Sequence, residues 1–392
     1  MKVKDRLTIF IKKSKGLSGK SYALLGAFML AVIIILGAFS AKQGNAVVAD
    51  IQEQDIQYRI TVAGDVRVSD NIRKMANKTS YRSLLAGVED CFQNSDHVMM
   101  NISGPVLQYG VQNYKSTRDK MEESIYVRAA ALRGFARAGV NVFAFANDDT
   151  YNYGITGIES TIRVLEKNQY EYLGIAQNTE TDFAKILSFE GKNADGTKIE
   201  RKISLLNVND NIRKYSTVSD KKTGIVNSSI STLYETIYSL SETTDYVIAY
   251  VHFYENTNTT SLEEQESLAK NLVDAGADLV IGNSESLHYM EKYKDSLILY
   301  SLGSFLSDAM YTNEKDSVMA DFVITKDNEM KVYLTPVHLE EGKPEIKLSG
   351  FYHTRICKLL TSELEEKDYR ITEDGRIEVS LGMLENRAVI VE

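Results

Sequence analysis

Two hydrophobic periods run along the chain after about residue 56. Strands are expected where apolar positions alternate or form short β-branched runs: residues 57–63, 97–102, 140–146, 203–208, 246–252, 277–282, 297–302 and 331–337. Helices are expected where apolar positions recur at helical spacing or a capping signal opens a run: residues 124–138, 157–168, 261–274 and 355–367. Strands that alternate with helices of about 12–15 residues predict an α/β layered domain.

Local turn and capping signals mark several of these boundaries. Gly139 follows the helix expected at 124–138 and suits the residue that closes a helix. The segment Ser261-Leu-Glu-Glu264 is a capping box that opens a helix ending near Asp274. Asp-Gly pairs at 195–196 and 374–375 predict tight turns. Only three prolines occur, so no proline-rich linker divides the chain.

The N-terminal region carries a different signal. Residues 22–39 are apolar without a charged side chain, which is long enough for a helix that spans a bilayer. Residues 1–20 carry a net charge of +6, and this predicts that the N-terminus stays in the cytoplasm. We therefore expect a single-pass protein of the cell membrane: a basic cytoplasmic tail at 1–20, a transmembrane helix at 21–41, a stalk at 42–56 and an extracytoplasmic main part. A cleaved signal peptide is the competing interpretation, although the apolar run exceeds the usual length of about 7–15 residues. A buried core helix is a third.

Charge and cysteine content narrow the possible partners. The formal net charge is −9, and the residues after position 20 carry −15, which argues against a nucleic-acid-binding surface. The two cysteines, Cys91 and Cys357, lie far apart and show no pairing signal. Oxidation is open to them outside the cytoplasm, but we expect two buried, unreactive thiols. No spacing of Cys and His suggests structural zinc.

Five predicted strands end in polar residues where the chain turns toward a helix: Asp65, Asn101, Asn147, His252 and Asn283. An open α/β sheet places its ligands at the carboxyl ends of its strands. A carboxylate such as Asp65 at this place suits a hard divalent cation. These strand ends are therefore the candidate site.

Six short motifs around these strand ends follow one another in the order of a known family. They are Thr61-Val-Ala-Gly-Asp-Val66, Asn101-Ile-Ser-Gly-Pro105, Asn147-Asp-Asp-Thr-Tyr-Asn-Tyr-Gly154, His252-Phe-Tyr-Glu-Asn256, Leu279-Val-Ile-Gly-Asn-Ser-Glu-Ser286 and Tyr300-Ser-Leu-Gly-Ser-Phe305. Together they resemble the CapA family of poly-γ-glutamate capsule biosynthesis proteins, which is similar to the calcineurin-type metallophosphoesterases. The resemblance runs from about residue 58 to 305 and weakly to about 380. It implies a layered calcineurin-like sandwich of mixed β-sheets flanked by helices at residues 57–310, which strands and a helix at 311–392 complete or extend.

The chain departs from the motifs of this family at positions that carry chemistry. Ser103 stands where the family has a Glu, and Asp149 stands where it has a His. Asn152 replaces an Asp, and two further His positions are taken by Asn283 and Ser286. A two-metal centre needs several His and carboxylate ligands around cations about 3.5–4 Å apart. The resemblance therefore implies an eroded centre, in which the survival of catalysis is an open question.

The resemblance also assigns roles to the positions that remain. The metal-ligand positions are Asp65, Asn147 and His252, which would hold at most one divalent ion (Mn, Zn or Mg), and otherwise no cofactor is expected. The catalytic positions are His252 and Asp149, although a carboxylate at 149 would repel an anionic substrate unless protonated. The binding positions are Asn101, Ser103, Asn147, Asn283 and Ser286.

Each of these residues also has a plain structural interpretation. Asp65 could cap the helix that follows it. His252 could be a strand-end histidine with satisfied hydrogen bonds, since a single His is rarely a ligand. Asp148 and Asp149 could be ordinary turn residues. His288 could compensate for the imidazole lost at 283, although metal geometry disfavours it.

Three functions stay open at this point. The first is a non-catalytic, membrane-anchored protein in capsule or cell-envelope polymer assembly or export, of the poly-γ-glutamate type. The second is a residual single-metal hydrolase that acts on a phosphoester or on an amide of an envelope polymer. The third is an extracytoplasmic domain that binds another membrane protein. The erosion of the metal ligands favours the first. The expected partners are the polymer, other envelope biosynthesis membrane proteins and, through residues 22–39, the membrane, but no nucleic acid.

Overall fold

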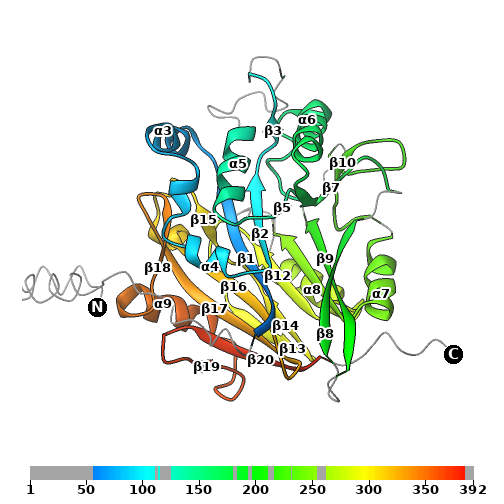
Figure 1. Ribbon diagram of the computed structural model, residues 1–392, viewed down its shortest axis with the longest axis vertical. Helices are drawn as coiled ribbons and strands as arrows, with labels where there is room; N and C mark the ends of the chain where they lie inside the picture. The colour runs from blue at the N-terminus through cyan, green and yellow to red at the C-terminus, as the bar shows by residue number, and fades with distance from the viewer. Residues whose placement is uncertain are drawn as a thin grey trace, which may run out of the picture. The chain divides into compact units, whose positions relative to one another are not determined.

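Two β-sheets lie face to face at the centre of the structure, a computed structural model (Figure 1). Apolar side chains from both sheets pack between them, among them Ile60 and Met99 from one and Ile248 and Ile281 from the other. These side chains recur at every second position because residues alternate across a strand. The alternation that predicts the strands therefore also forms the central core.

The first sheet joins segments from both ends of the described chain. Its strands run in the order β19-β20-β17-β16-β1-β2-β5-β6, with β15 beside β1 and β18 beside β17. Their bounds are β1 Ile56–Arg67, β2 His97–Ser103, β5 Val142–Ala144, β6 Glu171–Leu173, β15 Ser304–Leu306, β16 Asp316–Thr325, β17 Glu329–Glu340, β18 Lys343–Ile346, β19 Arg370–Ile371 and β20 Ile377–Met383. The strands β1, β2, β5 and β6 are parallel, whereas β16 is antiparallel to β1 and β17. Residues after 310 thus add strands to the sheet that begins with β1.

The second sheet runs in the order β13-β14-β12-β11-β9-β8. Its strands are β8 Ala184–Lys192, β9 Lys198–Asn209, β11 Tyr246–His252, β12 Leu279–Asn283, β13 Met290–Tyr293 and β14 Ser296–Leu299. Two short pairs lie apart from both sheets: β3 Val106–Leu107 with β4 Val127–Arg128, and β7 Ile175–Ala176 with β10 Gly224–Ile225. The inner strands β9, β11, β12 and β14 are parallel. Their carboxyl ends therefore share one edge, where an α/β sheet binds its ligands.

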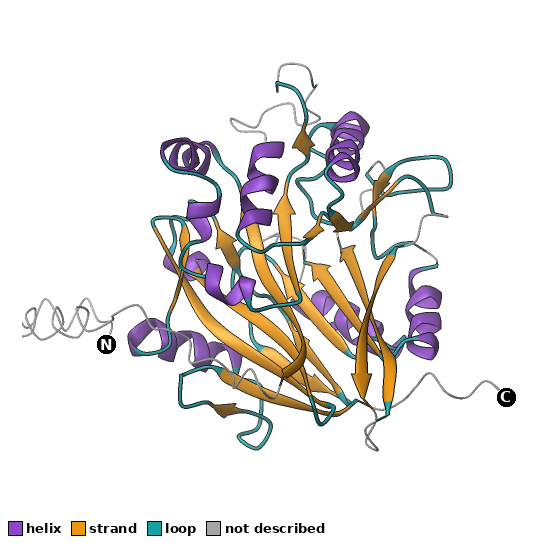
Figure 2. Cartoon of the chain, viewed as in Figure 1, coloured by secondary structure: helices purple, strands orange, loops and turns teal. Residues whose placement is uncertain are grey.

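Helices cover the outer face of each sheet, and one further helix, Gly350–Leu360, packs on the inner face of the first sheet with Ile356 and Leu360 in the central core (Figure 2). They are α3 Asp70–Lys78, α4 Glu89–Gln93, α5 Ala129–Arg137, α6 Gly154–Lys167, α7 Leu233–Thr243, α8 Leu262–Asp274 and α9 Gly350–Leu360, with short 3₁₀ turns η2 Arg82–Leu85 and η4 Thr312–Lys315. Phe135 of α5 and Ile162 of α6 pack on the first sheet, and Ile237 of α7 and Leu272 of α8 pack on the second. The layers follow one another as helices, sheet, sheet and helices. The expected layered α/β architecture with mixed sheets is confirmed.

The structure describes residues 56–110, 114, 125–179, 183–192, 197–210, 216–230, 232–253 and 262–384. The tail, the transmembrane helix and nearly all of the stalk expected at 1–56 lie outside these residues. So do Ser261 of the capping box and the Asp-Gly pair at 195–196. Within the described ranges, no helix is both long and apolar enough to cross a membrane.

Two helices have bounds that differ from those the hydrophobic periodicity predicts. The helix expected at 124–138 begins only at Ala129, because Val127 and Arg128 pair with β3 as a short strand instead. The helix expected at 355–367 spans Gly350–Leu360. It ends where the Thr361 hydroxyl bonds the Cys357 carbonyl at 2.9 Å, a local contact that competes with helix continuation. Tertiary pairing and a side-chain contact thus override the local pattern.

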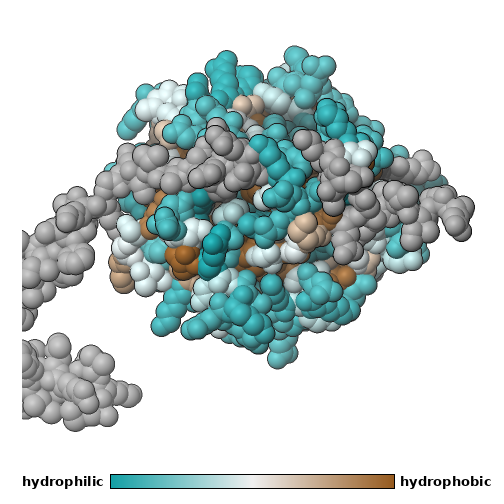
Figure 3. Space-filling view, turned by 60° about the horizontal axis from the view of Figure 1, so that its bottom comes forward, coloured by the Kyte–Doolittle hydropathy of each residue, from teal (hydrophilic) through white to brown (hydrophobic). Residues whose placement is uncertain are grey.

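The surface view in Figure 3 shows a largely hydrophilic face with small hydrophobic groups between polar ones. Scattered apolar side chains are ordinary on a globular surface. In the described part of the chain, two strongly exposed ones, Met310 and Tyr311, are adjacent in sequence, with exposures of 80% and 65%. They lie beside the cleft described below.

Candidate functional site

A bulge in β1 places the first candidate residue. The pairing of β1 with β2 shifts register between Ala63 and Asp65. Gly64 lies at this shift, where an added Cβ would come within 2.1 Å of the Gly303 carbonyl oxygen, so only glycine fits. After the bulge Asp65 pairs with Asn101, which shares a strand face with Met99 of the central core. The bulge therefore turns Asp65 toward the second sheet.

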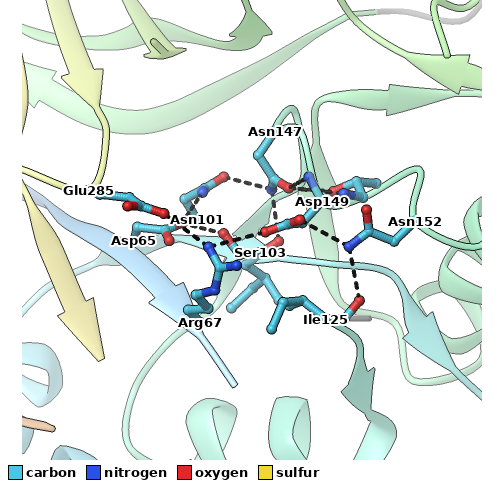
Figure 4. A network of polar contacts seen from close by, with 11 residues as sticks. Asp65, Arg67, Asn101, Ser103, Ile125, Asn147, Asp149, Asn152 and Glu285 are labelled. Carbon is cyan, nitrogen blue, oxygen red and sulfur yellow. Dashed lines mark hydrogen bonds and ion pairs between the residues drawn. The ribbon is translucent and has the colours of Figure 1, made fainter. Parts of the chain in front are cut away.

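Three candidate residues form one chain of hydrogen bonds around the Asp65 carboxylate (Figure 4). Its Oδ1 atom accepts from Asn101 Nδ2 at 2.5 Å and from the Ser103 hydroxyl at 2.7 Å. Asn101 in turn accepts at Oδ1 from Asn147 Nδ2 at 3.2 Å. Asp65 does not cap the next helix, because Ser69 holds that position and accepts from the Ile72 amide. The capping interpretation of Asp65 is therefore wrong.

Asn147 organises the loop that follows β5. Its Oδ1 atom accepts from the amides of Asp149 and Thr150 at 3.2 and 3.1 Å and from the Thr150 hydroxyl at 3.0 Å. Its Nδ2 atom also donates to the Ile102 carbonyl at 2.8 Å. This is the side-chain-to-backbone pattern of an Asx turn. Both polar ends of Asn147 are thus engaged in holding the loop on β2.

Asp149 faces a cation that the sequence motifs do not single out. Its Oδ1 accepts from Asn152 Nδ2 at 2.9 Å, and its Oδ2 lies 3.6 Å from Arg67 Nη1. The same Nη1 lies 3.0 Å from Glu285 Oε1 (Figure 4). Burial by itself lowers the pKa of Arg67. The nearby carboxylates of Asp149 and Glu285 raise it by more, so the pKa of Arg67 lies above its usual value. One guanidinium thus bridges two loops from opposite sheets.

The second sheet brings three polar residues into register at its carboxyl edge. Asn209, His252 and Asn283 end β9, β11 and β12, and His252 pairs with both of the others. Asn283 lies on the strand face of Leu279 and Ile281, toward the first sheet. It is fully buried, and among the described residues neither of its side-chain polar atoms has a hydrogen-bond partner. The Nδ1 atom of His252 is also buried and has no hydrogen-bond partner within the described ranges, which does not agree with the satisfied strand-end histidine considered from the sequence.

Two contacts show that the carboxyl edges of the two sheets meet. The hydroxyl of Tyr250 in β11 donates to the Ala63 carbonyl of β1 at 2.9 Å. Burial, and secondarily the Asp65 carboxylate, raise the pKa of this Tyr250 phenol well above its usual range. On the other side Asn209 Nδ2 donates to Asp148 Oδ1 at 3.3 Å. The candidate residues from both sheets therefore belong to one polar centre.

A cleft of about 220 Å³ opens beside this centre. Its lining residues are Asp65, Arg67, Glu285, Ser304, Ser307, Asp308, Ala309, Met310, Tyr311 and Glu314. They include four carboxylates and one guanidinium, so the wall of the cleft is acidic. Ser286 and His288 are not among these lining residues.

The family assignment follows from the sequence comparison. Residues 59–309 match the family model described as bacterial capsule synthesis protein PGA_cap. The chain belongs to this family. It is 24% identical over 384 residues to the capsule biosynthesis protein CapA of Bacillus anthracis, covering 96% of this chain and 90% of that protein. It is also 24% identical to the PGA biosynthesis protein CapA of Bacillus subtilis (strain 168), over 76% of this chain and 77% of that protein.

Solved structures with a similar course of the chain include the calcineurin-like phosphoesterase YfkN from Bacillus subtilis. That comparison has a TM-score of 0.37 at 12% identity and covers 74% of this chain and 88% of that one. The match to the family model and the two CapA relatives confirm the CapA resemblance of the motifs.

The polar centre of this family member does not fit a metal pair. Within the described residues, no group of three or more His, Cys, Asp or Glu side chains is placed to hold a metal ion. Of the three expected ligands, Asn147 has its oxygen occupied by three donors, and Asp65 accepts two hydrogen bonds at Oδ1. Asn and Ser at 283 and 286 offer far weaker metal donors than imidazole. The single-metal set of Asp65, Asn147 and His252 stays a prediction.

The sequence analysis did not identify two residues of this centre. Arg67 follows Asp65 by two positions in one strand, and the period of two places it on the same face, so the signal was present. Glu285 lies in the turn after β12, and its approach to Arg67 depends on how two distant segments pack. No local pattern could have indicated it.

Proposed function

We propose that the protein serves the assembly or export of a poly-γ-glutamate-type envelope polymer as a non-catalytic component. In this proposal residues 21–41 anchor it in the membrane and the α/β domain lies outside. Family membership supports the capsule-related role. The observation that supports the non-catalytic role is the polar centre, in which hydrogen bonds engage Asp65 and Asn147 and an arginine faces Asp149.

The chemistry of the donor set supports the same proposal. Hydrolysis by a metal centre requires an open coordination position and a water that the metal makes acidic. Here Asp149 stands at a His position and contacts Arg67 at 3.6 Å, and Asn283 stands at another. A carboxylate cannot donate a proton at neutral pH unless its pKa is strongly raised. The centre is better suited to holding the two sheets together than to activating water.

The charge of the protein constrains how it could hold a polymer. The residues after position 20 carry −15, and an anionic polymer such as polyglutamate would be repelled by such a surface. Binding would need local basic side chains or a bridging cation. We therefore expect polymer contact to depend on ionic strength, or to pass through a partner membrane protein.

Complementation tests the proposal. A strain that lacks the gene would receive the wild-type chain, Asp65→Asn or His252→Ala, and surface polymer would be measured together with protein level. We expect both variants to restore the polymer, because neither residue performs chemistry. Gly64→Val is the matched loss-of-fold control, since a side chain there meets the Gly303 carbonyl. Loss of polymer with normal protein level in both variants would overturn the non-catalytic role.

One observation favours a second candidate, the residual single-metal hydrolase. His252 and Asn283 lie side by side at the strand ends, and the buried Nδ1 of His252 and both polar side-chain atoms of Asn283 have no hydrogen-bond partner among the residues described. Unpaired buried polar atoms often mark a bound group or a catalytic role. Hydrolysis of a phosphoester or amide substrate that disappears in His252→Ala would support this candidate over the first.

A further inference from the structure

Three carboxylates converge on the polar centre from separate segments. Asp65 comes from β1, Asp149 from the loop after β5, and Glu285 from the turn after β12. Asp65 and Asp149 are at least nine-tenths buried, with exposures of 4% and 7%. Carboxylates held close together in a partly buried site repel one another, and either one takes a proton or a cation balances them.

A cation is already in place in the form of Arg67. Its Nη1 atom lies 3.0 Å from Glu285 Oε1 and 3.6 Å from Asp149 Oδ2. Arg67 lies on the strand face of Asp65, paired with Ser103 of β2. Figure 4 shows the guanidinium pointing into the space between the loops that carry Asp149 and Glu285. It therefore occupies the place where the carboxylates need positive charge.

The neutral donors of the centre complete the arrangement. Asn101 and Ser103 hold one oxygen of Asp65, and Asn152 holds one oxygen of Asp149. The guanidinium faces the other oxygen of Asp149, so Asp65 and Asp149 are each held by neutral donors at one oxygen. A guanidinium suits this role because it is always charged and offers donors in several directions. A metal ion would have to displace it.

We propose that the guanidinium of Arg67 supplies the positive charge that a divalent cation supplies in a metal centre, so that Asp65, Asp149 and Glu285 are balanced without metal. The centre is then a metal-independent ion network that ties the loop after β5 to the turn after β12. This goes beyond the proposed function, because it names the group that replaces the metal. It would hold whichever polymer or partner the protein serves.

Manganese binding by the full-length protein in detergent tests the proposal. Equilibrium dialysis and thermal unfolding would compare the wild type, Arg67→Lys and Arg67→Ala, with NaCl of equal ionic strength as the salt control. We expect no stoichiometric manganese in the wild type or in Arg67→Lys. Without Arg67 the loops that carry Asp149 and Glu285 are free to close on a metal, which the arrangement with Arg67 does not allow. Arg67→Ala should therefore unfold at a lower temperature without metal, bind manganese at least about tenfold more tightly than the wild type and regain stability with it. Adding Asp149→Asn to Arg67→Ala should abolish this uptake.

Several outcomes would overturn the proposal. Stoichiometric manganese in the wild type would show that the centre accepts metal with Arg67 present. An Arg67→Ala protein with unchanged stability and no manganese uptake would show that the carboxylates need no cation. Protection of the wild type by inorganic phosphate, lost in Arg67→Ala, would show that the guanidinium serves an anionic ligand instead.

A charge-neutral variant covers the case in which Arg67→Ala does not fold. Arg67→Gln keeps a long side chain with amide donors but carries no charge. We expect Arg67→Gln to be less stable than Arg67→Lys and to be stabilised by manganese, because charge is the decisive property. Wild-type stability of Arg67→Gln together with a loss in Arg67→Lys would show that hydrogen bonding alone matters, and this would refute the role of the charge. Complementation by these variants reports separately on the proposed function.

Discussion

Replacement of Asn283 by leucine should stabilise the protein. Asn283 is fully buried at the end of β12, and neither its amide nitrogen nor its oxygen has a hydrogen-bond partner in the part of the chain that the structure describes. Each buried polar group without a hydrogen bond destabilises the folded state by about 1–3 kcal/mol. Leucine has the same number of side-chain heavy atoms but a larger volume, which offsets part of the gain by about 1 kcal/mol. Two such groups less this offset give an expected rise in the free energy of unfolding of about 1–5 kcal/mol.

A matched variant on the first sheet serves as the control for this prediction. Asn101 is also fully buried near a strand end, but it donates to Asp65 at 2.5 Å and accepts from Asn147 at 3.2 Å. Asn101→Leu should lower the free energy of unfolding by about 3–5 kcal/mol, because it leaves a buried carboxylate short of a donor. The two substitutions are chemically identical, so their opposite signs isolate the effect of hydrogen-bonding partners.

Urea denaturation followed by far-ultraviolet circular dichroism would measure both variants. A shift of the midpoint at unchanged slope reports stability alone. A loss of stability in Asn283→Leu as large as that in Asn101→Leu would refute the reasoning. It would mean that Asn283 has polar partners in solution, such as an ordered water or a ligand, and that position 283 still has a binding role.

Three further expectations concern the loop, the bulge and the thiols. Asn147→Ala should lower the free energy of unfolding by about 3–5 kcal/mol, because it removes the hydrogen bonds that hold the loop, and the urea midpoint would show it. Gly64→Ala should cost at least about 2 kcal/mol, because its Cβ meets the Gly303 carbonyl; unchanged thermal unfolding would contradict this. Burial raises the pKa of Cys91 to about 12 and that of Cys357 to about 11, so neither thiol should react quickly with iodoacetamide at pH 8 in the native protein. Because both thiol pKa values are raised in the folded state, keeping the two thiols protonated favours folding. This contribution to the free energy of unfolding is present below the usual thiol pKa of 9.0 and is lost as the pH rises above it. Denaturation at several pH values would check this.

Strand and helix positions could be predicted well from the periodicity of the chain. The run 246–252 coincides with β11, and 97–102 lies within β2, because apolar alternation reports directly on burial in a sheet. The helix expected at 124–138 was misplaced at its start, because Val127 and Arg128 pair with a strand some 20 residues earlier in the chain. Local pattern cannot contain that information.

The candidate site could be predicted in part. Asp65, Asn101, Ser103 and Asn147 were all named from motifs, and the structure joins them through hydrogen bonds. Their proximity follows because parallel strands end at one edge of a sheet. Ser286 and His288 lie beyond the end of β12 and do not line the cleft beside this network. Arg67 and Glu285 could be identified as part of the site only from the structure.

The sequence by itself determined the family, the layered α/β class and the positions at which metal ligands were replaced, because motif order and periodicity are properties of the chain alone. Only the tertiary structure decided what those replacements do. The contacts between Arg67, Asp149 and Glu285 depend on how two sheets approach each other, and so does the lack of a partner for Asn283 among the described residues. Hydrogen bonds and ion pairs form or fail over a few tenths of an ångström, a scale that sequence spacing does not specify.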